Sequence, residues 1–156
     1  MRLLAFAFVL LGEMALFGCK AKPPAAGETQ LMWTMKHHIF VGNKSQVNPL
    51  RLSSKAVADG QEAFSHYCAA CHGLDGQNTG VPFADRMAPP VPSLASANVQ
   101  QYTDGQLKWV IDNGIWPTGM PASRGILNDE EIWSIVIFIR HLPRAGTLGD
   151  PKMYDQ

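Results

Sequence analysis

The chain has 156 residues, which is enough for one domain with short extensions at its ends. Its formal net charge is zero, so the overall charge gives no support to nucleic-acid binding. The charge is nevertheless uneven. Residues 20–60 hold six basic and two acidic groups (net +4), and residues 61–156 hold six basic and ten acidic groups (net −4). Such a basic arm can lie over the acidic region or near anionic lipid, or can simply be solvated surface.

The first predicted element is an export signal over residues 1–18, where a short apolar run follows one basic residue. A membrane-spanning helix is the competing interpretation. A span needs about 20 apolar residues, and Glu13 inside the run disfavours it. The run ends in Gly18-Cys19, which resembles a bacterial lipobox, although Phe17 is bulkier than usual. We expect lipidation of Cys19, with simple cleavage or an uncleaved anchor as alternatives.

The next region, residues 20–55, separates this signal from the predicted domain. Residues 20–30 are rich in Pro, Ala and Lys and predict a flexible tether. Residues 31–55 have no clean period, and Pro49 interrupts any helix, so we expect an extended segment that wraps the domain. His37 and His38 are possible iron ligands, although surface or packing positions are their more ordinary interpretation.

A first helix is predicted from Ser54 to Ala70. Small and apolar residues recur there at three- and four-residue steps and form one stripe: Ala56, Gly60, Ala63, Phe64 and Tyr67. A glycine in mid-helix costs about 1 kcal/mol relative to alanine. Gly60 therefore indicates a place where another backbone approaches closely.

The end of this helix carries Cys68-Ala-Ala-Cys71-His72, the C-x-x-C-H pattern of covalent c-type haem attachment. Cysteines three residues apart lie one helical turn from each other, so both thiols can form thioethers with the two vinyl groups of one porphyrin. His72 follows at once, and imidazole is a common iron ligand. The sequence therefore predicts one covalent haem c, with His72 as a ligand to its iron.

Other sites share the C-x-x-C spacing: a redox dithiol, half of a zinc site and a structural disulfide. The chain has only one further cysteine, Cys19, and no second Cys/His pair at zinc-binding spacing. No convincing strand precedes Cys68, as a thioredoxin-like unit would require. Haem attachment is therefore the preferred interpretation.

An irregular loop is predicted over residues 73–96, because three glycines and four prolines fall within it. Met87 is a thioether in this loop; packing is its ordinary role, and it ranks below Met120 as a ligand. Arg86 is a candidate partner for a haem propionate, with an exposed surface position as the default. The loop thus holds secondary candidates for contacts with the cofactor.

A helix is predicted from Asp104 to Asn113, because Thr103 and Gln106 have the spacing of a capping box and Gly114 suits its end. Within it, Trp109 either touches the haem edge or simply packs. The loop that follows contains Met120 between a glycine and a proline. A thioether is a soft ligand that suits low-spin haem iron, and the flanking residues restrict the loop.

The last helix is predicted from Asp129 to His141. Asn128 is a good N-cap, Glu131 completes a capping box, and the acidic first turn complements the helix dipole. The tail, residues 144–156, is polar and has no period, so we expect it to be loosely attached.

Together these motifs resemble a class I, single-haem bacterial cytochrome c over residues 56–143. The resemblance implies an all-α fold of about four helices around one covalently bound haem. It also implies that Met120 is the distal axial ligand opposite His72. In this family a loop carbonyl accepts a hydrogen bond from the proximal imidazole, and we assign it to Pro90, with Pro89 as runner-up. The first and last helices are expected to cross closely, as such domains do.

Haem iron that binds two protein side chains has no open coordination position, which suits electron transfer rather than catalysis. The resemblance therefore implies an electron carrier and not an enzyme, exported to the periplasmic face of a membrane and lipid-anchored at Cys19. Its partners would be redox proteins, with no small-molecule substrate and no nucleic acid. The alternative is a cytochrome subunit of a larger membrane or periplasmic oxidoreductase complex. A catalytic or gas-binding haem would need Met120 off the iron.

Overall fold

A computed structural model describes residues 31, 35, 41–116 and 118–149. By its internal contacts the chain divides into residues 1–34 and 35–156, and the account below concerns the second unit. The predicted signal, Cys19, the tether, His37 and His38 all lie outside the described residues. Within the described ranges, no helix has the length and apolarity that a membrane crossing requires.

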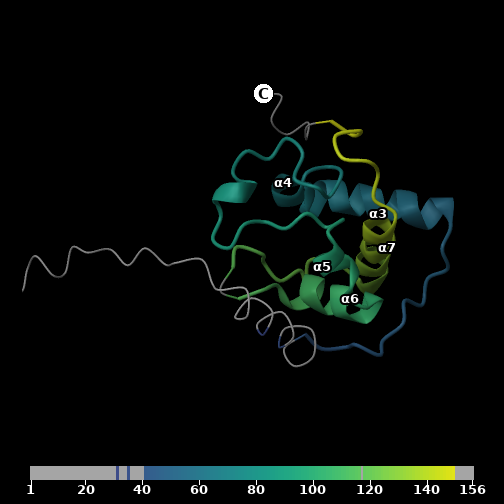
Figure 1. The fold of residues 1–156 in the computed structure, drawn as a ribbon. Coiled ribbons are helices and arrows are strands. Elements are labelled where there is room, and N and C mark those ends of the chain that lie inside the picture. The colour runs from purple at the N-terminus through teal and green to yellow at the C-terminus, as the bar shows by residue number, and fades with distance from the viewer. Residues whose placement is uncertain (1–30, 32–34, 36–40, 117, 150–156) are drawn as a thin grey trace, which may run out of the picture. The chain divides into compact units, whose positions relative to one another are not determined.

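The regular elements of the described residues are all helices (Figure 1), as the predicted all-α class requires. The one β-type contact among these residues is an isolated bridge between Arg124 and Leu127. In chain order the helices are α3 (Ser54–Tyr67), α4 (Ala69–His72), the short 3₁₀ helix η2 (Ala84–Arg86), α5 (Ala97–Gln100), α6 (Asp104–Asn113) and α7 (Asp129–Arg140). The three long ones correspond to the three helices that the sequence predicts.

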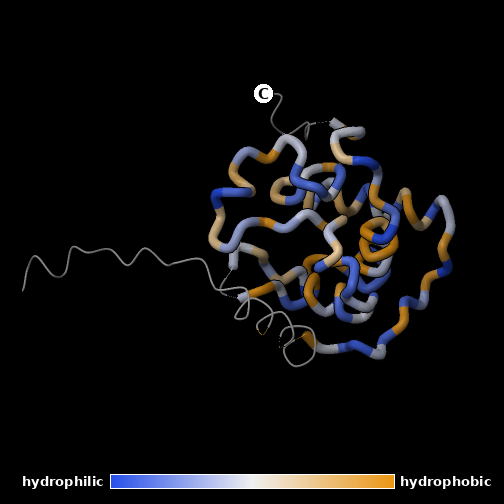
Figure 2. Tube along the Cα trace, viewed as in Figure 1, coloured by the Kyte–Doolittle hydropathy of each residue, from blue (hydrophilic) through white to orange (hydrophobic). Residues whose placement is uncertain are grey.

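The core is built where α3 crosses α7. A Cβ atom added to Gly60 would lie 2.0 Å from the carbonyl oxygen of Ser134, so the two backbones touch at this glycine. Beside it, the rings of Phe64 and Phe138 pack with centroids 5.1 Å apart. Ile135 is fully buried in the same cluster. Figure 2 shows α7 as largely hydrophobic. Every residue of this helix from 132 to 139 is buried.

The first helix ends earlier than predicted. Residue Cys68 is the C-cap of α3, with φ −118° and ψ −30°, and the chain restarts as α4. The N–H of Cys68 still donates to Phe64 O at 2.9 Å, so the turn continues while the dihedrals leave the helical range. The sequence has no glycine or proline at this point, which is why the periodicity suggested one continuous helix.

Residues 41–53, which we call the strap, run extended before α3 and lie against α6. A Cβ atom on Gly105 would lie 2.0 Å from Asn43 O, and Thr103 Oγ1 donates to Lys44 O at 2.9 Å. At the other end, Asn48 Nδ2 donates to the carbonyl of Trp133 at 3.0 Å. The strap is therefore fastened to α6 and α7 by specific polar contacts.

The residues after α7 are not loosely attached, which corrects the prediction for positions 144–149. The backbone N–H of Gly146 donates to Asp75 Oδ2 at 2.7 Å. Gln77 Nε2 donates to Pro143 O at 2.7 Å, and a Cβ atom on Gly76 would meet the Leu142 side chain at 2.8 Å. The segment is thus held on the loop that follows His72, an interaction between residues too distant in sequence for a local pattern to reveal.

Candidate haem site

Cys68, Cys71 and His72 share a single turn of helix. The backbone N–H groups of Cys71 and His72 both donate to Cys68 O, at 3.1 and 3.0 Å. Both cysteines are free thiols, so they are not a disulfide. Gly73 ends the turn with φ +71°, a conformation that favours glycine. The structure therefore keeps two thiols and one imidazole together within five residues.

Burial dominates the electrostatics of this turn. It raises the pKa of the Cys68 thiol to about 12, and the neighbouring Cys71 adds to the shift, so Cys68 stays protonated at neutral pH. Burial lowers the pKa of His72, and the backbone of Pro92 beside the imidazole opposes part of that change. A neutral imidazole is the form that binds a metal.

His72 also has an unused polar atom. Its Nδ1 is buried and has no hydrogen-bond partner among the described residues, so the contact with Pro92 falls short of normal hydrogen-bond geometry. One face of the ring is near Phe64, with centroids 6.4 Å apart. A histidine that binds a metal through one ring nitrogen usually donates the N–H of the other to an acceptor, and the Pro92 backbone is the main chain beside this ring.

The loop with Met120 is folded tightly on itself. The N–H of Ile115 donates to Met120 O at 3.2 Å, and Met120 N donates to Thr118 Oγ1 at 3.2 Å. Gly114, with φ +66°, makes this possible, because a Cβ atom there would lie 2.6 Å from Met120 O. Met120 is half-buried against the hydrophobic core.

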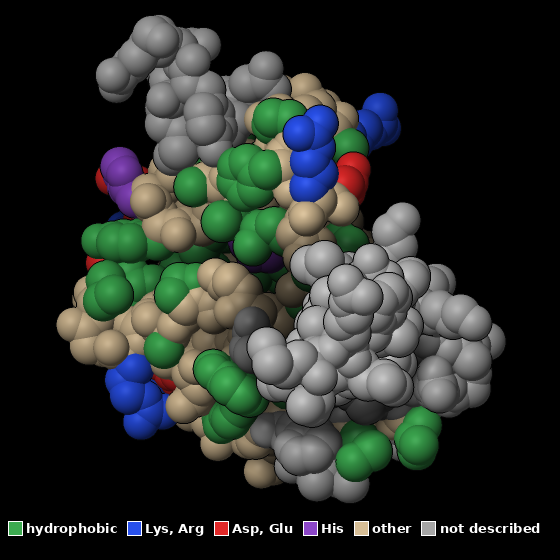
Figure 3. Space-filling view, turned by 90° about the vertical axis from the view of Figure 1, so that its left-hand side faces the viewer, with side chains coloured by type: hydrophobic (Ala, Val, Ile, Leu, Met, Phe, Trp, Pro, Cys, Tyr) green, Lys and Arg blue, Asp and Glu red, His purple; other side chains and the backbone are tan. Residues whose placement is uncertain are grey.

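Met87 lies against the same loop. A Cβ atom on Gly119 would lie 2.4 Å from the Met87 methyl carbon, so this side chain lies next to the residue before Met120. The two thioethers that the sequence singles out are therefore on adjoining loops. Figure 3 shows a hollow in one face of the molecule, with hydrophobic side chains along its rims and a histidine inside it.

The residues present fit a covalently attached haem. Its attachment needs two unpaired thiols one turn apart, its iron needs a neutral imidazole, and its ring needs apolar surroundings. Cys68, Cys71 and His72 meet the first two requirements. In the present orientation of the ring, His72 Nδ1 has no hydrogen-bond partner among the described residues; a rotation of the ring would change which acceptor it faces.

For the other predicted residues, the structure shows no contact with this turn among those it describes. Pro90 is exposed, and the proline backbone beside His72 is that of Pro92, two residues later. Trp109 packs on the strap, since a Cβ atom on Gly42 would lie 2.8 Å from its Nε1. Arg86 is exposed at the end of η2. Sequence reasoning did not single out Pro92, because the direction of a carbonyl in a proline-rich loop depends on dihedrals that no motif records.

Asn78 was also missed. It has φ +66°, and it bonds both to the main chain of His72 and to that of Val91. An asparagine a few residues after the motif, among glycines, is the type of residue that adopts a left-handed conformation. That signal was present in the sequence.

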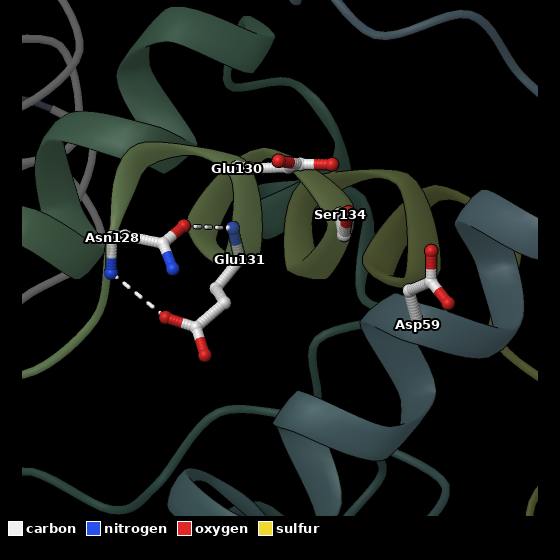
Figure 4. A pocket seen from close by; sticks show the side chains of 5 residues that line it. All are labelled: Asp59, Asn128, Glu130, Glu131 and Ser134. Carbon is white, nitrogen blue, oxygen red and sulfur yellow. Dashed lines mark hydrogen bonds between the residues drawn. The ribbon is translucent and has the colours of Figure 1, made fainter.

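A separate shallow pocket lies between α3 and α7 (Figure 4), lined by Asp59, Asn128, Glu130, Glu131 and Ser134. Two of its three carboxylates are already engaged: Asp59 Oδ2 is 2.6 Å from Lys55 Nζ, and Glu131 is part of the cap of α7. Within the described part of the chain, no group of three or more His, Cys, Asp or Glu side chains is placed to hold a metal ion. Within this part of the chain, the turn with Cys68, Cys71 and His72 therefore remains the candidate cofactor site.

An all-α domain with a C-x-x-C-H turn at the end of its first helix is the architecture of a cytochrome c. The family model described as cytochrome c oxidase, cbb3-type, subunit III matches residues 55–139. Because the match covers more than half of the chain, the chain belongs to this family and is an electron-transfer haem protein with a haem c domain. None of the curated proteins matches the chain.

Proposed function

We propose that this chain is a single-haem cytochrome c that transfers one electron at a time between redox proteins. Cys68 and Cys71 are the thioether attachment points, His72 is the proximal axial ligand and Met120 the distal one. The observation that carries the proposal is the single turn that holds two free thiols and a buried imidazole. The fold of the Met120 loop supports the distal assignment.

When bound, the haem supplies an iron that exchanges a single electron between its ferric and ferrous states. The protein's part is to hold two ligands and exclude water. His72 is already neutral and buried, and the Met120 loop is closed by its own hydrogen bonds, so neither ligand needs ordering at each electron transfer. Two side-chain ligands would leave the iron no position for a substrate, which suits a carrier.

A second candidate is an electron-transferring subunit of a larger oxidoreductase complex. The family description, an oxidase subunit III, supports it. The two candidates share the same haem chemistry and differ in whether the chain stays bound to its partners. Co-purification of the chain with other subunits at a fixed ratio, after mild detergent extraction, would favour the subunit; a free chain would favour the mobile carrier.

The same proposal includes export and anchoring. A signal over residues 1–18 and a lipid on Cys19 would hold the haem domain, residues 56–143, at the periplasmic face of a bacterial membrane through the tether and strap. The apolar run followed by Gly18-Cys19 supports this arrangement. Mass spectrometry of the mature N-terminus tests it: a diacylglyceryl group on Cys19 is the expected result, and an intact residue 1 would refute it.

The ligand assignment is tested by the visible and near-infrared spectrum of the full-length protein and of two variants, Met120→Ala and Met87→Ala. We expect a low-spin c-type spectrum with the near-infrared band of methionine ligation, lost only in Met120→Ala. The Met87 variant is the matched control, because its thioether lies in the adjoining loop. Loss of the band in Met87→Ala alone would reassign the distal ligand. A protein with no haem would return Cys68 and Cys71 to dithiol or zinc chemistry.

A further inference from the structure

Asn78 is joined to the main chain of the proposed proximal ligand. Its backbone N–H donates to His72 O at 2.8 Å. To do so it adopts φ +66°, a left-handed conformation that asparagine tolerates better than most residues. The loop after the C-x-x-C-H turn therefore folds back onto His72 at this residue.

The side chain of Asn78 extends the link to the second segment around the imidazole. Its Nδ2 donates to Val91 O at 2.8 Å. That oxygen belongs to the planar peptide bond between Val91 and Pro92, so the hydrogen bond fixes the orientation of the plane from which Pro92 begins. The backbone of Pro92 is the one that lies beside the His72 ring. One residue thus holds both the main chain of His72 and the segment that faces its side chain.

The remaining polar atom of Asn78 argues against a purely conformational role. Its Oδ1 is buried and has no partner among the described residues. A buried polar atom without a partner destabilises the folded protein. A glycine would supply the same backbone angle and the same N–H without that cost. The side chain is therefore in place for its bond to Val91 O.

We propose that Asn78 is a positioning residue that fixes the orientation of the His72 imidazole and thereby tunes the reduction potential of the haem domain. The inference rests on the proposed function, in which His72 is an axial ligand. Nδ1 makes no normal hydrogen bond to the residues that this structure describes, and in the haem-loaded protein the Pro92 backbone beside the ring would supply the carbonyl that accepts one. Such a bond makes the imidazole a stronger donor, which favours the ferric state. Releasing the Val91–Pro92 peptide would weaken it and raise the potential.

The test compares Asn78→Gly with Asn43→Gly in the full-length, haem-loaded protein. Asn78→Gly keeps the positive φ and the N–H to His72 O and removes only the side-chain bond. Asn43 is the matched control, since it is the other described non-glycine residue with a positive φ (60°) and it lies exposed in the strap. We expect the ratio of reduced to oxidised haem at a fixed solution potential to rise about tenfold in Asn78→Gly, equivalent to ~59 mV for one electron. Asn43→Gly should leave it unchanged.

An unchanged potential in Asn78→Gly, with a wild-type low-spin spectrum and a lower melting temperature, would make Asn78 a structural residue and overturn the proposal. If Asn78→Gly does not accumulate, Asn78→Ala serves the same test, because it removes the amide while restricting the unfolded chain more. Failure of both to attach haem would also refute it, since the proposal requires only the backbone bond for folding. If the spectra of the unmodified protein exclude His72 as a ligand, the proposed function itself has failed.

Discussion

Replacing Gly60 with alanine tests the close crossing of α3 and α7. The added methyl carbon would lie 2.0 Å from Ser134 O and 2.5 Å from Ser134 C, whereas ordinary contacts begin at 3.4 Å. The clashing atoms are backbone, so the helices must separate by about 1.4 Å at this point, which loosens the packing of Phe64 on Phe138. Overpacking of this kind costs about 3 kcal/mol. The better helix propensity of alanine returns about 1 kcal/mol, so we expect a net loss of about 2 kcal/mol.

The assay is denaturant unfolding of the haem-loaded protein followed by far-ultraviolet circular dichroism, with the midpoint and slope fitted together. Ala58→Gly is the control, because Ala58 is exposed on the same helix and its substitution by glycine carries only the propensity cost of about 1 kcal/mol. A Gly60→Ala protein as stable as the unmodified chain, or more stable, would show that the two backbones do not touch at this glycine.

Three further predictions concern buried or close contacts. Burial by itself would raise the pKa of Asp75, but hydrogen bonds from Thr79, Gly146 and Gln77 outweigh it and lower the pKa. The ionised carboxylate therefore stabilises the fold above the unfolded pKa of about 3.9, and this stabilisation is lost as pH falls through the lower folded pKa. The difference in melting temperature between the unmodified chain and Asp75→Asn should therefore shrink from pH 7 to pH 3. Lys108→Met removes the ammonium that lies 2.8 Å from Asp112 Oδ2 and leaves this carboxylate buried without its partner. The free energy of unfolding in urea should fall by about 3 kcal/mol, and adding Asp112→Leu should recover most of that loss. Gly105→Ala should lift the strap off α6 and speed proteolysis within residues 41–53, and an unchanged cleavage rate would contradict the 2.0 Å approach to Asn43 O.

Local signals in the sequence were sufficient for the parts of the fold that depend on neighbours in the chain. The capping box of Thr103 and Gln106 predicted the start of α6, and Gly114 predicted its end. The structure has the same bounds. Asn128 and Glu131 did the same for the start of α7. Gly60 indicated a close approach because a mid-helix glycine has no other local advantage.

Other features depend on contacts that no local pattern carries. The end of α3 at Tyr67 follows from dihedrals at Cys68, not from a breaking residue. The choice of Pro92 over Pro90 beside His72 depends on how the proline-rich loop turns. The hydrogen bond from Gly146 to Asp75 joins residues 71 positions apart. Nothing in the sequence around either residue distinguishes it from other loop positions.

That long-range bond has a consequence for the order of events during synthesis. The chain is made from its N-terminus, so the two thiols and His72 emerge well before the segment that encloses their loop exists. At about 5–20 residues per second, the 71 positions between Asp75 and Gly146 take roughly 4 to 14 seconds to add. α7, which completes the core around Phe64, lies in the same late stretch. The loop that follows the two thiols and His72 therefore cannot be closed until residues 129–146 are present.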